Sequence, residues 1–275
     1  NRVVKMIKDM IYLDYNANAP IFDKVKDDIM KNLNLFGNPS AIHSLGKNIN
    51  ENIESSRQLI LNLFNAVNSK VIFTSSGTES NNLILKKIKN IDYFLTSSTE
   101  HYSVLNVRED FQLINVCENG LVDLEDLKKK LKELNSKRFL LSTMLVNNEN
   151  GVIQPIKEIS KIVKKYGGFL HCDAAQAIGK MKINFDDLGI DSMTLSSHKF
   201  GGPIGVSGLI IKNHLKINEF LLGGDQEYSL RSGSVNFIMI APFAKAIEYT
   251  KSEEYESELV KIFNWRDWFE KNLKK

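Results

Sequence analysis

The stretch SSHKFGGP, residues 196–203, places the amine of Lys199 between small polar residues and a Gly-Gly-Pro turn. The apolar run 192–195 precedes it and predicts a buried strand that ends just before the lysine. Open α/β sheets keep their ligands at the carboxyl ends of strands, so we expect Lys199 at a ligand site. An amine whose surroundings disfavour the ammonium form can make a Schiff base with a carbonyl compound. A solvated loop lysine is the alternative, and other parts of the chain decide between the two.

Two other stretches supply groups that suit such a site. Asp173 ends the strand-like run 168–172 and offers a carboxylate, which can keep a pyridine nitrogen protonated. Residues 74–80, TSSGTES, follow a further strand and open a helix, where free backbone amides bind phosphate. Lysine, strand-end Asp and phosphate cradle together indicate pyridoxal phosphate. Asp173 could instead act as a helix cap, and the Thr78 hydroxyl could be only an N-cap.

Composition indicates one large soluble α/β domain. The 275 residues are 43% hydrophobic and 25% charged, and the net charge of +3 argues against nucleic-acid binding. No apolar run approaches the ~20 residues of a membrane-spanning helix, so we expect no membrane partner. Cys117 and Cys172 form no C-x-x-C pair, which favours a reducing compartment, and we assign no metal ligand.

Strands and helices alternate from residue 71 onward, which predicts a mostly parallel seven-stranded sheet with helices on both faces. The expected strands are 71–74, 93–96, 111–117, 138–145, 168–172, 192–196 and 206–212. The expected helices are 23–35, 44–65, 78–89, 123–134 and 155–166, with a helical tail over 235–275 and a short strand ahead of residue 23. Asp123 is the expected cap of its helix, and Pro155 the expected first helical residue.

Eight motifs in order resemble those of the cysteine desulfurases of the aminotransferase class V group, which remove sulfur from cysteine for iron–sulfur cluster assembly. They are YLDYNA (12–17), GNPS (37–40), TSSGTES (74–80), TEH (99–101), VNNENG (146–151), HCDAAQ (171–176), SHK (197–199) and RSGS (231–234). The resemblance implies the large domain of a PLP-dependent transferase of the aspartate aminotransferase type (fold type I). We expect an N-terminal segment (1–22), a PLP-binding large domain (23–250), and the start of a truncated C-terminal small domain (251–275).

The resemblance also implies a role for each site residue. Lys199 would carry pyridoxal 5'-phosphate, His101 would lie against the ring and move protons, and Asp173 would pair with the ring nitrogen. The remaining implied cofactor contacts are Gly77, Thr78, Ser196, Ser197 and His198 at the phosphate, Gln176 at the phenolic oxygen, and Asn148 near that oxygen and the substrate carboxylate.

A homodimer with shared active sites is implied as well, with Ser234 reaching the phosphate of the neighbouring subunit. Three further histidines are not assigned to the catalytic set. His171 is expected to be buried near the ring, His43 to be structural, and His214 to lie in a surface loop.

The implied reaction converts L-cysteine to L-alanine and passes the sulfur, as a persulfide, to an acceptor such as an iron–sulfur scaffold protein or towards tRNA thiolation. Lys199 or His101 would remove the α-proton. The family's sulfur-accepting cysteine and its substrate-binding arginine come after this region and are expected to be missing. Cys172 is expected to be an inert core thiol, and Cys117 is not expected to act either.

Three interpretations remain open from the sequence. The chain is a cysteine desulfurase without its small domain, another class V enzyme such as a selenocysteine lyase or a transaminase, or a non-catalytic scaffold. The expected location is the cytoplasm, or the mitochondrial matrix or another organelle in a eukaryote.

Overall fold

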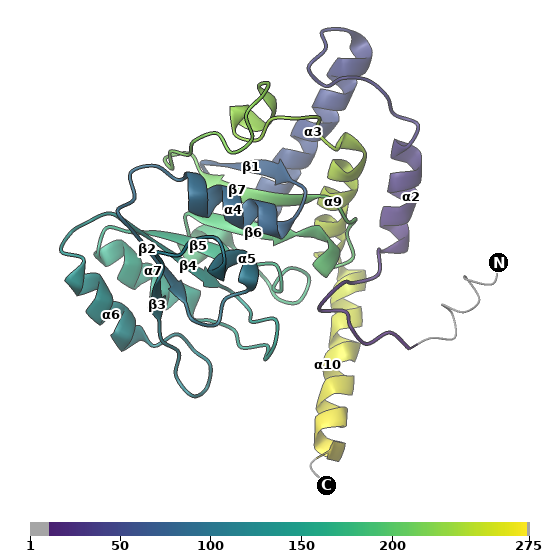
Figure 1. Ribbon diagram of the computed structural model, residues 1–275. Coiled ribbons are helices and arrows are strands. Elements are labelled where there is room, and N and C mark those ends of the chain that lie inside the picture. Colours follow the sequence, from purple (N-terminus) through teal and green to yellow (C-terminus); the bar gives the residue numbers. More distant parts are fainter. Residues whose placement is uncertain (1–10, 274–275) are drawn as a thin grey trace.

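A seven-stranded sheet forms the centre of the computed structural model, which describes residues 11–273. The strands are β1 (Ser69–Thr74), β2 (Tyr93–Ser97), β3 (Gln112–Ile114), β4 (Phe139–Met144), β5 (Phe169–Asp173), β6 (Ser192–Ser196) and β7 (Ser207–Lys212). Their order across the sheet is β1-β7-β6-β5-β4-β2-β3, and β7 runs antiparallel to both of its neighbours. The other neighbouring pairs are parallel, so the predicted sheet is confirmed (Figure 1).

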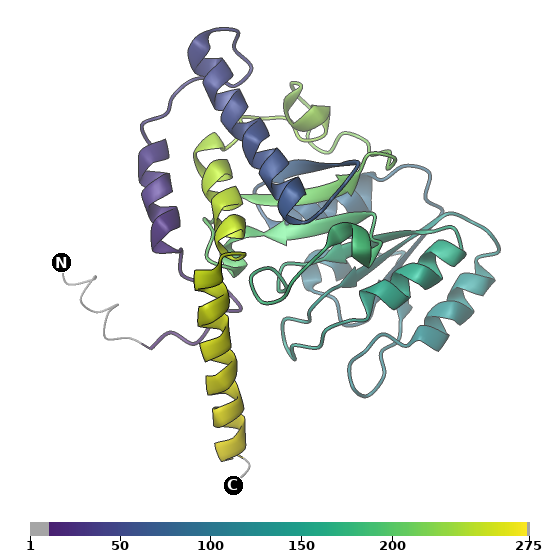
Figure 2. The same cartoon turned by 180° about the vertical axis from the view of Figure 1, so that it is seen from behind.

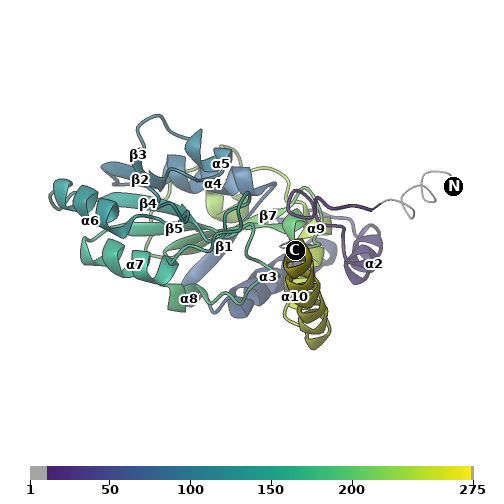
Figure 3. The same ribbon diagram turned by 90° about the horizontal axis from the view of Figure 1, so that it is seen from below.

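Helices cover both faces of this sheet. The helices of the described residues are α2 (Asp23–Asn32), α3 (Ser44–Leu63), α4 (Gly77–Lys87), α5 (Tyr102–Leu105), α6 (Leu124–Glu133), α7 (Ile156–Lys165), α8 (Phe185–Leu188), α9 (Phe237–Tyr249) and α10 (Glu253–Leu273), with short 3-10 turns at Ser197–Lys199 and Gln226–Ser229. Figure 3 shows α4 and α5 on one side of the sheet and α7 and α8 on the other. Seen from behind, α9 lies between α2 and α3 (Figure 2), and it packs against both.

The alternation of side chains along β1 explains why helices are needed on both faces. Val71 and Phe73 are buried in the core that α3, α7 and α9 complete, whereas Ile72 between them belongs to the core beneath α4. Successive strand residues point to opposite faces, so an apolar run of this kind buries its surface only between two helical layers.

The first residues of α6 and α7 test two predictions about helix starts. Asp123 is confirmed as a cap, since its Oδ1 accepts hydrogen bonds from the amides of Glu125 and Asp126 at 2.9 and 3.1 Å. Pro155 is not the first residue of α7, because it occupies the N-cap position and Ile156 begins the helix. The error is one residue.

The strand expected ahead of residue 23 is wrong. Residues 11–22 form turns and irregular backbone. The amides of Ala19 and Phe22 donate to the carbonyls of His198 and Gly201, at 2.8 and 3.0 Å. This segment is thus held by the loop around Lys199 and not by a strand edge.

The predicted tail is largely helical between residues 237 and 273, while residues 274–275 lie outside the described residues. It forms α9 and α10, and no residue of α10 is buried. In Figures 1 and 2 this helix extends away from the rest of the chain. Over residues 11–273, no helix has the length and apolar character needed to cross a membrane. The three-part division at residues 22 and 250 stays a prediction.

Candidate active site

A pocket of about 370 Å³ lies at the edge of the sheet where β5 and β6 end. Carboxyl ends of neighbouring parallel strands meet at one edge, which is where open α/β sheets bind ligands. Nine of the predicted site residues line this pocket: Gly77, Thr78, His101, Asn148, Asp173, Gln176, Ser196, His198 and Lys199. Separate stretches of sequence thus come together as expected.

The other two predicted residues do not line it. Ser197 is fully buried, and its Oγ has no hydrogen-bond partner and packs against Gly202, where an added Cβ would collide with it. The backbone turns between consecutive residues here, so Ser196 faces the pocket and Ser197 faces away. Ser234 is exposed and lies outside the lining of the pocket of its own chain. Its implied contact with a neighbouring subunit stays a prediction.

Lys199 is half-buried and presents its amine to the pocket. Nζ donates a hydrogen bond to the carbonyl oxygen of Asn16 at 3.0 Å. Burial lowers the pKa of Lys199, although the negative charges of Asp173 and Asp14 act in the opposite direction. A lowered pKa increases the neutral, nucleophilic fraction of the amine, which Schiff-base chemistry requires.

Asp173 is the last residue of β5 and is held through both carboxylate oxygens. Oδ1 accepts from the amide of Ala175 at 2.9 Å, and Oδ2 accepts from the side-chain amide of Asn81 at 2.8 Å. The capping role and the pocket role are therefore compatible, because the carboxylate caps the following turn while it lines the pocket.

The start of α4 lines the pocket at the place where the sequence predicts an anion site. Ser76 is the N-cap, with Oγ accepting from the amide of Glu79 at 3.1 Å, so Thr78 is not the cap. The first amides of a helix have no acceptor within the helix, and together with the helix dipole they favour a phosphate. An added Cβ at Gly77 would lie 3.4 Å from Cβ of Ser196, at van der Waals contact, so the start of α4 lies beside the end of β6.

His101 and Gln176 each take specific partners at the pocket. His101 caps α5, with Nδ1 accepting from the amide of Ser103 at 3.0 Å. The side chain of Gln176 donates to the carbonyl of Asn16 at 2.9 Å and accepts from Lys180 at 2.6 Å. Gln176 thus holds the same backbone oxygen to which Lys199 is bonded.

Two asparagines in the polar run after β4, Asn147 and Asn148, have different roles. Asn147 builds the turn, because its Oδ1 accepts from the amides of Glu149 and Asn150 at 2.9 and 3.1 Å. Asn148 lines the pocket, and its side chain donates to Glu149 at 2.6 Å. The turn and the site residue are neighbours in the same motif.

The remaining histidines are structural in this chain. His43 caps α3 by accepting from the amide of Gly46 at 3.2 Å, and the side chain of His214 is exposed near Asp191. His171 is fully buried and does not line the pocket, and burial lowers its pKa to about 3. Next to the site, burial together with repulsion from Lys199 likewise lowers the pKa of Lys180 to about 8.

Sequence reasoning missed four residues of this region: Asn16, Asn81, Ser103 and Lys180. A weak signal existed for Asn81, which follows Gly77 by four residues and therefore shares its helix face. Asn16 lies within the YLDYNA motif, which gave it no role at the site, and nothing in the sequence distinguishes Ser103 and Lys180 before the chain is folded.

The groups in this pocket fit one class of ligand. A lysine of lowered pKa, a strand-end carboxylate and the amino terminus of α4 all lie on one cavity. A phosphorylated pyridine aldehyde needs these three partners. Fold and site therefore define a PLP-binding α/β protein.

Comparison with known proteins agrees with this class. The family model for aminotransferase class V matches residues 11–275. The cysteine desulfurase IscS of Dictyoglomus turgidum is 37% identical over 98% of this chain, which spans 71% of that protein. The mitochondrial cysteine desulfurase of Saccharomyces cerevisiae is also 37% identical, over 96% of this chain, which spans only 55% of that protein. The X-ray structure of a NifS-like protein from Rickettsia africae superposes with a TM-score of 0.90 at 38% identity, covering 96% of this chain and 75% of that one.

The chain belongs to the aminotransferase class V family. Within it, the chain groups with the cysteine desulfurases of the IscS and NifS type, which are PLP-dependent enzymes of fold type I.

Proposed function

We propose that this chain binds PLP through Lys199 and forms the cofactor-binding part of a cysteine desulfurase that acts on L-cysteine. The observation that carries the proposal is the position of Lys199, whose amine of lowered pKa shares one pocket with Asp173 and the start of α4. The names of the relatives support the substrate, and a similar solved structure is described as SspA in complex with cysteine, at 30% identity and a TM-score of 0.80.

When bound, PLP withdraws electrons from the α-carbon of an amino acid attached to it. Asp173 would hold the ring nitrogen protonated, and the amides of Gly77 and Thr78, with Ser196 and His198, would hold the phosphate. The Lys199 amine would attach the cofactor and take the α-proton of the substrate. Gln176 and Asn148 would orient the ring oxygen and the substrate carboxylate.

Acceptance of the sulfur requires a group outside this set. Cys117 and Cys172, the two cysteines of the chain, are both absent from the pocket lining. Burial, reinforced by the charges of Asp173 and Glu100, raises the pKa of the Cys172 thiol well above its ordinary value, so its reactive thiolate is disfavoured. We therefore expect another cysteine to form the persulfide, with an iron–sulfur scaffold protein or another sulfur carrier as the final acceptor.

The assembly is part of the proposal. A homodimer would bring Ser234 to the phosphate of the neighbouring subunit, and its exposure in the single chain is compatible with that contact. Bacterial and mitochondrial relatives support the cytoplasm or the mitochondrial matrix as the location. A transaminase or a selenocysteine lyase would use the same cofactor pocket with another substrate, whereas a non-catalytic scaffold would convert no substrate.

The first experiment tests the attachment of the cofactor. PLP is added to the purified chain, the visible spectrum is recorded, borohydride is added, and the labelled peptide is mapped by mass. We expect the label on Lys199. Lys199→Arg should abolish it, whereas Lys180→Arg should keep it, although Lys180 also has a lowered pKa. Label on Lys180 in the wild type, or no label, would contradict the proposed site.

The second experiment tests the substrate. L-Cysteine, L-selenocysteine and L-alanine are each added to the loaded chain, and the spectral change and any sulfide are followed. We expect L-cysteine to change the spectrum without rapid sulfide release by the isolated chain, because the pocket contains no cysteine. Preference for L-selenocysteine would favour a selenocysteine lyase instead, and preference for L-alanine a transaminase.

A further inference from the structure

A chain of buried polar side chains runs beneath the pocket and passes through Asn81 of α4. Asn81 and His171 are fully buried, and Ser103 is nearly so. The side-chain nitrogen of Asn81 lies 2.8 Å from Oδ2 of Asp173 and 2.9 Å from Oγ of Ser103. The side-chain amide of Asn81 therefore links the carboxylate of Asp173, at the end of β5, to the hydroxyl of Ser103 next to His101.

The orientation of this amide follows from its neighbours. Its oxygen lies 3.1 Å from Nε2 of His171, while its nitrogen faces the carboxylate of Asp173. A flipped amide would place its oxygen against that carboxylate, with two acceptors in contact. His171 is neutral, because burial lowers its pKa to about 3, and its proton is on Nε2 since Asn81 Oδ1 can only accept. Nδ1 of His171 then accepts from Oγ of Ser192 at 2.8 Å.

The proton of His101 is fixed in the same way. The Ser103 hydroxyl accepts from Asn81, and its Oγ, with its own hydrogen left to donate, lies 2.9 Å from Nδ1 of His101. The backbone amide of Ser103 donates to the same nitrogen at 3.0 Å. Two donors meet at Nδ1, so this nitrogen is unprotonated and the proton of the neutral ring is on Nε2.

We propose that Asn81 is a positioning residue of this site, which holds Asp173 directly and, through Ser103, keeps His101 as the neutral tautomer protonated on Nε2. A ring in this form can donate a hydrogen bond from Nε2 but has no lone pair there to take a proton. The inference rests on the proposed function, and in that reaction it leaves the removal of the α-proton to Lys199. It also connects three elements of the site, because Asn81 lies one turn after Gly77 on α4 and contacts residues of β5 and α5.

Nuclear magnetic resonance of the chain labelled with ¹⁵N-histidine tests this without cofactor or activity. There are five histidines, and the signals of His101 and His171 are assigned with His→Gln variants. The wild type is expected to show His101 with a protonated Nε2 and an unprotonated Nδ1. Asn81→Leu, of similar size but without hydrogen-bonding groups, should move the ring signals of both histidines.

The adjacent residue Asn82 provides the matched control. It lies on the same helix, is partly exposed, and bonds only locally to the carbonyl of Thr78 at 2.9 Å. Asn82→Leu should leave both histidines unchanged. In the loaded chain, Asn81→Leu should weaken PLP binding at least about tenfold, because Asp173 loses a hydrogen bond to a charged group. Asn82→Leu should bind PLP as the wild type does.

A second variant decides the question if Asn81→Leu does not fold. Ser103→Ala leaves Asn81 and His171 intact and removes only the branch to His101, so it should move the His101 signals and not those of His171. A wild-type His101 with its proton on Nδ1, or a His101 unaffected by both variants, would overturn the proposal. Failure of PLP to label Lys199 would instead refute the proposed function and leave the spectra without cofactor unaffected.

Discussion

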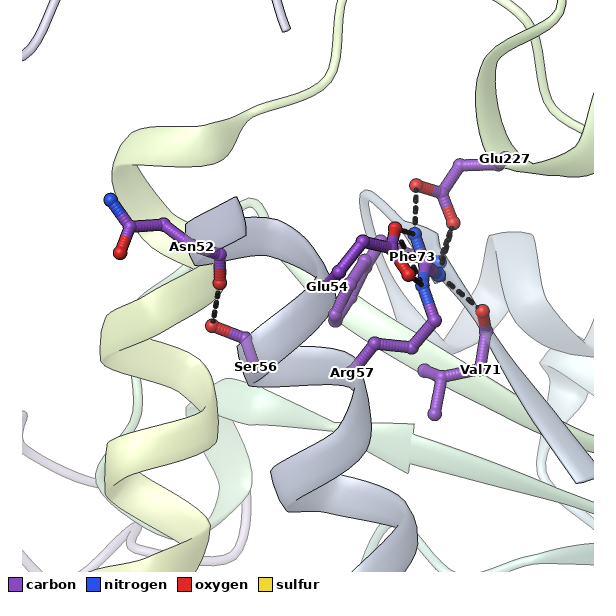
Figure 4. Close-up of polar contacts among 7 residues, drawn as sticks. All are labelled: Asn52, Glu54, Ser56, Arg57, Val71, Phe73 and Glu227. Atoms are coloured by element: carbon purple, nitrogen blue, oxygen red, sulfur yellow. Dashed lines mark hydrogen bonds and ion pairs between the residues drawn. The ribbon is translucent and has the colours of Figure 1, made fainter. Parts of the chain in front are cut away.

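Replacing Glu227 by Gln is expected to destabilise this protein far more than an equivalent change in its neighbour Glu54. Both carboxylates pair with the guanidinium of Arg57 (Figure 4). Glu227 accepts two hydrogen bonds from Arg57, at 2.9 and 3.1 Å, and one from the amide of Phe73 at 2.7 Å. The side chains of Arg57 and Glu227 are only 7% and 3% exposed, whereas that of Glu54 is 53% exposed.

These exposures set the magnitudes. Removing one member of a buried, hydrogen-bonded pair leaves an uncompensated charge and costs about 3–5 kcal/mol of unfolding free energy. The cost of Glu227→Gln should lie near the lower end of this range, because Arg57 keeps Glu54 and the carbonyl of Val71 as partners. Glu54→Gln removes a solvent-screened contact of the same guanidinium and should cost less than about 1 kcal/mol.

The pair also holds an unfavourable backbone conformation. Glu227, Tyr228 and Ser229 have φ values of 48°, 60° and 59°, in the left-handed region that residues other than glycine rarely adopt. Each such residue costs on the order of 1 kcal/mol or more. The guanidinium of Arg57 also lies 5.0 Å from the ring centroid of Tyr228. It therefore contacts the turn at two residues, the carboxylate of Glu227 and the ring of Tyr228.

Urea unfolding followed by far-ultraviolet circular dichroism measures these differences. The set comprises the wild type, Glu227→Gln, Arg57→Met, the double variant and Glu54→Gln. The double variant should be less destabilised than the sum of the two single variants by about 2 kcal/mol, since contacting residues are coupled. If Glu227→Gln proves no more costly than Glu54→Gln, or if the two single changes add, the buried pair does not hold the turn and the reasoning is wrong.

Three further outcomes follow from the described geometry. A thiol reagent should modify exposed Cys117 in the native chain and reach Cys172 only after unfolding, and two reactive thiols in the native chain would contradict the burial. Burial, with a smaller effect from the charge of Asp173, raises the pKa of Glu100 in the folded chain well above its ordinary 4.5. The stability that Glu100 contributes is therefore full below pH 4.5 and is lost as the pH rises toward the folded pKa. Glu100→Gln should therefore gain stability relative to the wild type as pH increases, by up to about 1.4 kcal/mol per pH unit, and a difference independent of pH in urea unfolding would refute this. Ser76→Ala should cost about 1 kcal/mol by loss of the α4 cap, and Thr78→Ala clearly less, in the same assay without cofactor.

Much of the fold was predictable, because hydrophobic runs and helix signals act locally. The seven strands were placed within a few residues, and the Asp123 cap was identified from its own side chain. The failed strand ahead of residue 23 shows the limit. Its amides pair with the loop after β6, so its conformation depends on residues about 180 positions away, which no local pattern reveals.

The same contrast between local and long-range interactions explains which site residues could be predicted. Those that act through their own motif, such as Lys199, Asp173 and Gly77, could be found from the sequence, and all three line the pocket. Asn81 had only a weak signal and Ser103 had none, since both matter through partners on other elements. Ser197 was assigned to the pocket by resemblance, but its side chain lies on the opposite side of a tight turn, against Gly202.

Position, and not basicity alone, distinguishes the two lysines of this region. Burial lowers the pKa of both, and that of Lys180 reaches about 8 with the added repulsion of Lys199. The amine of Lys180, however, is bonded to the side-chain oxygens of Gln176 and Asn16, at 2.6 and 3.0 Å, and does not line the pocket. Lys199 has only the Asn16 carbonyl to leave, at 3.0 Å, and it faces the cavity. The position of Lys199 on the cavity thus favours a single attachment point in a site with two lysines of lowered pKa.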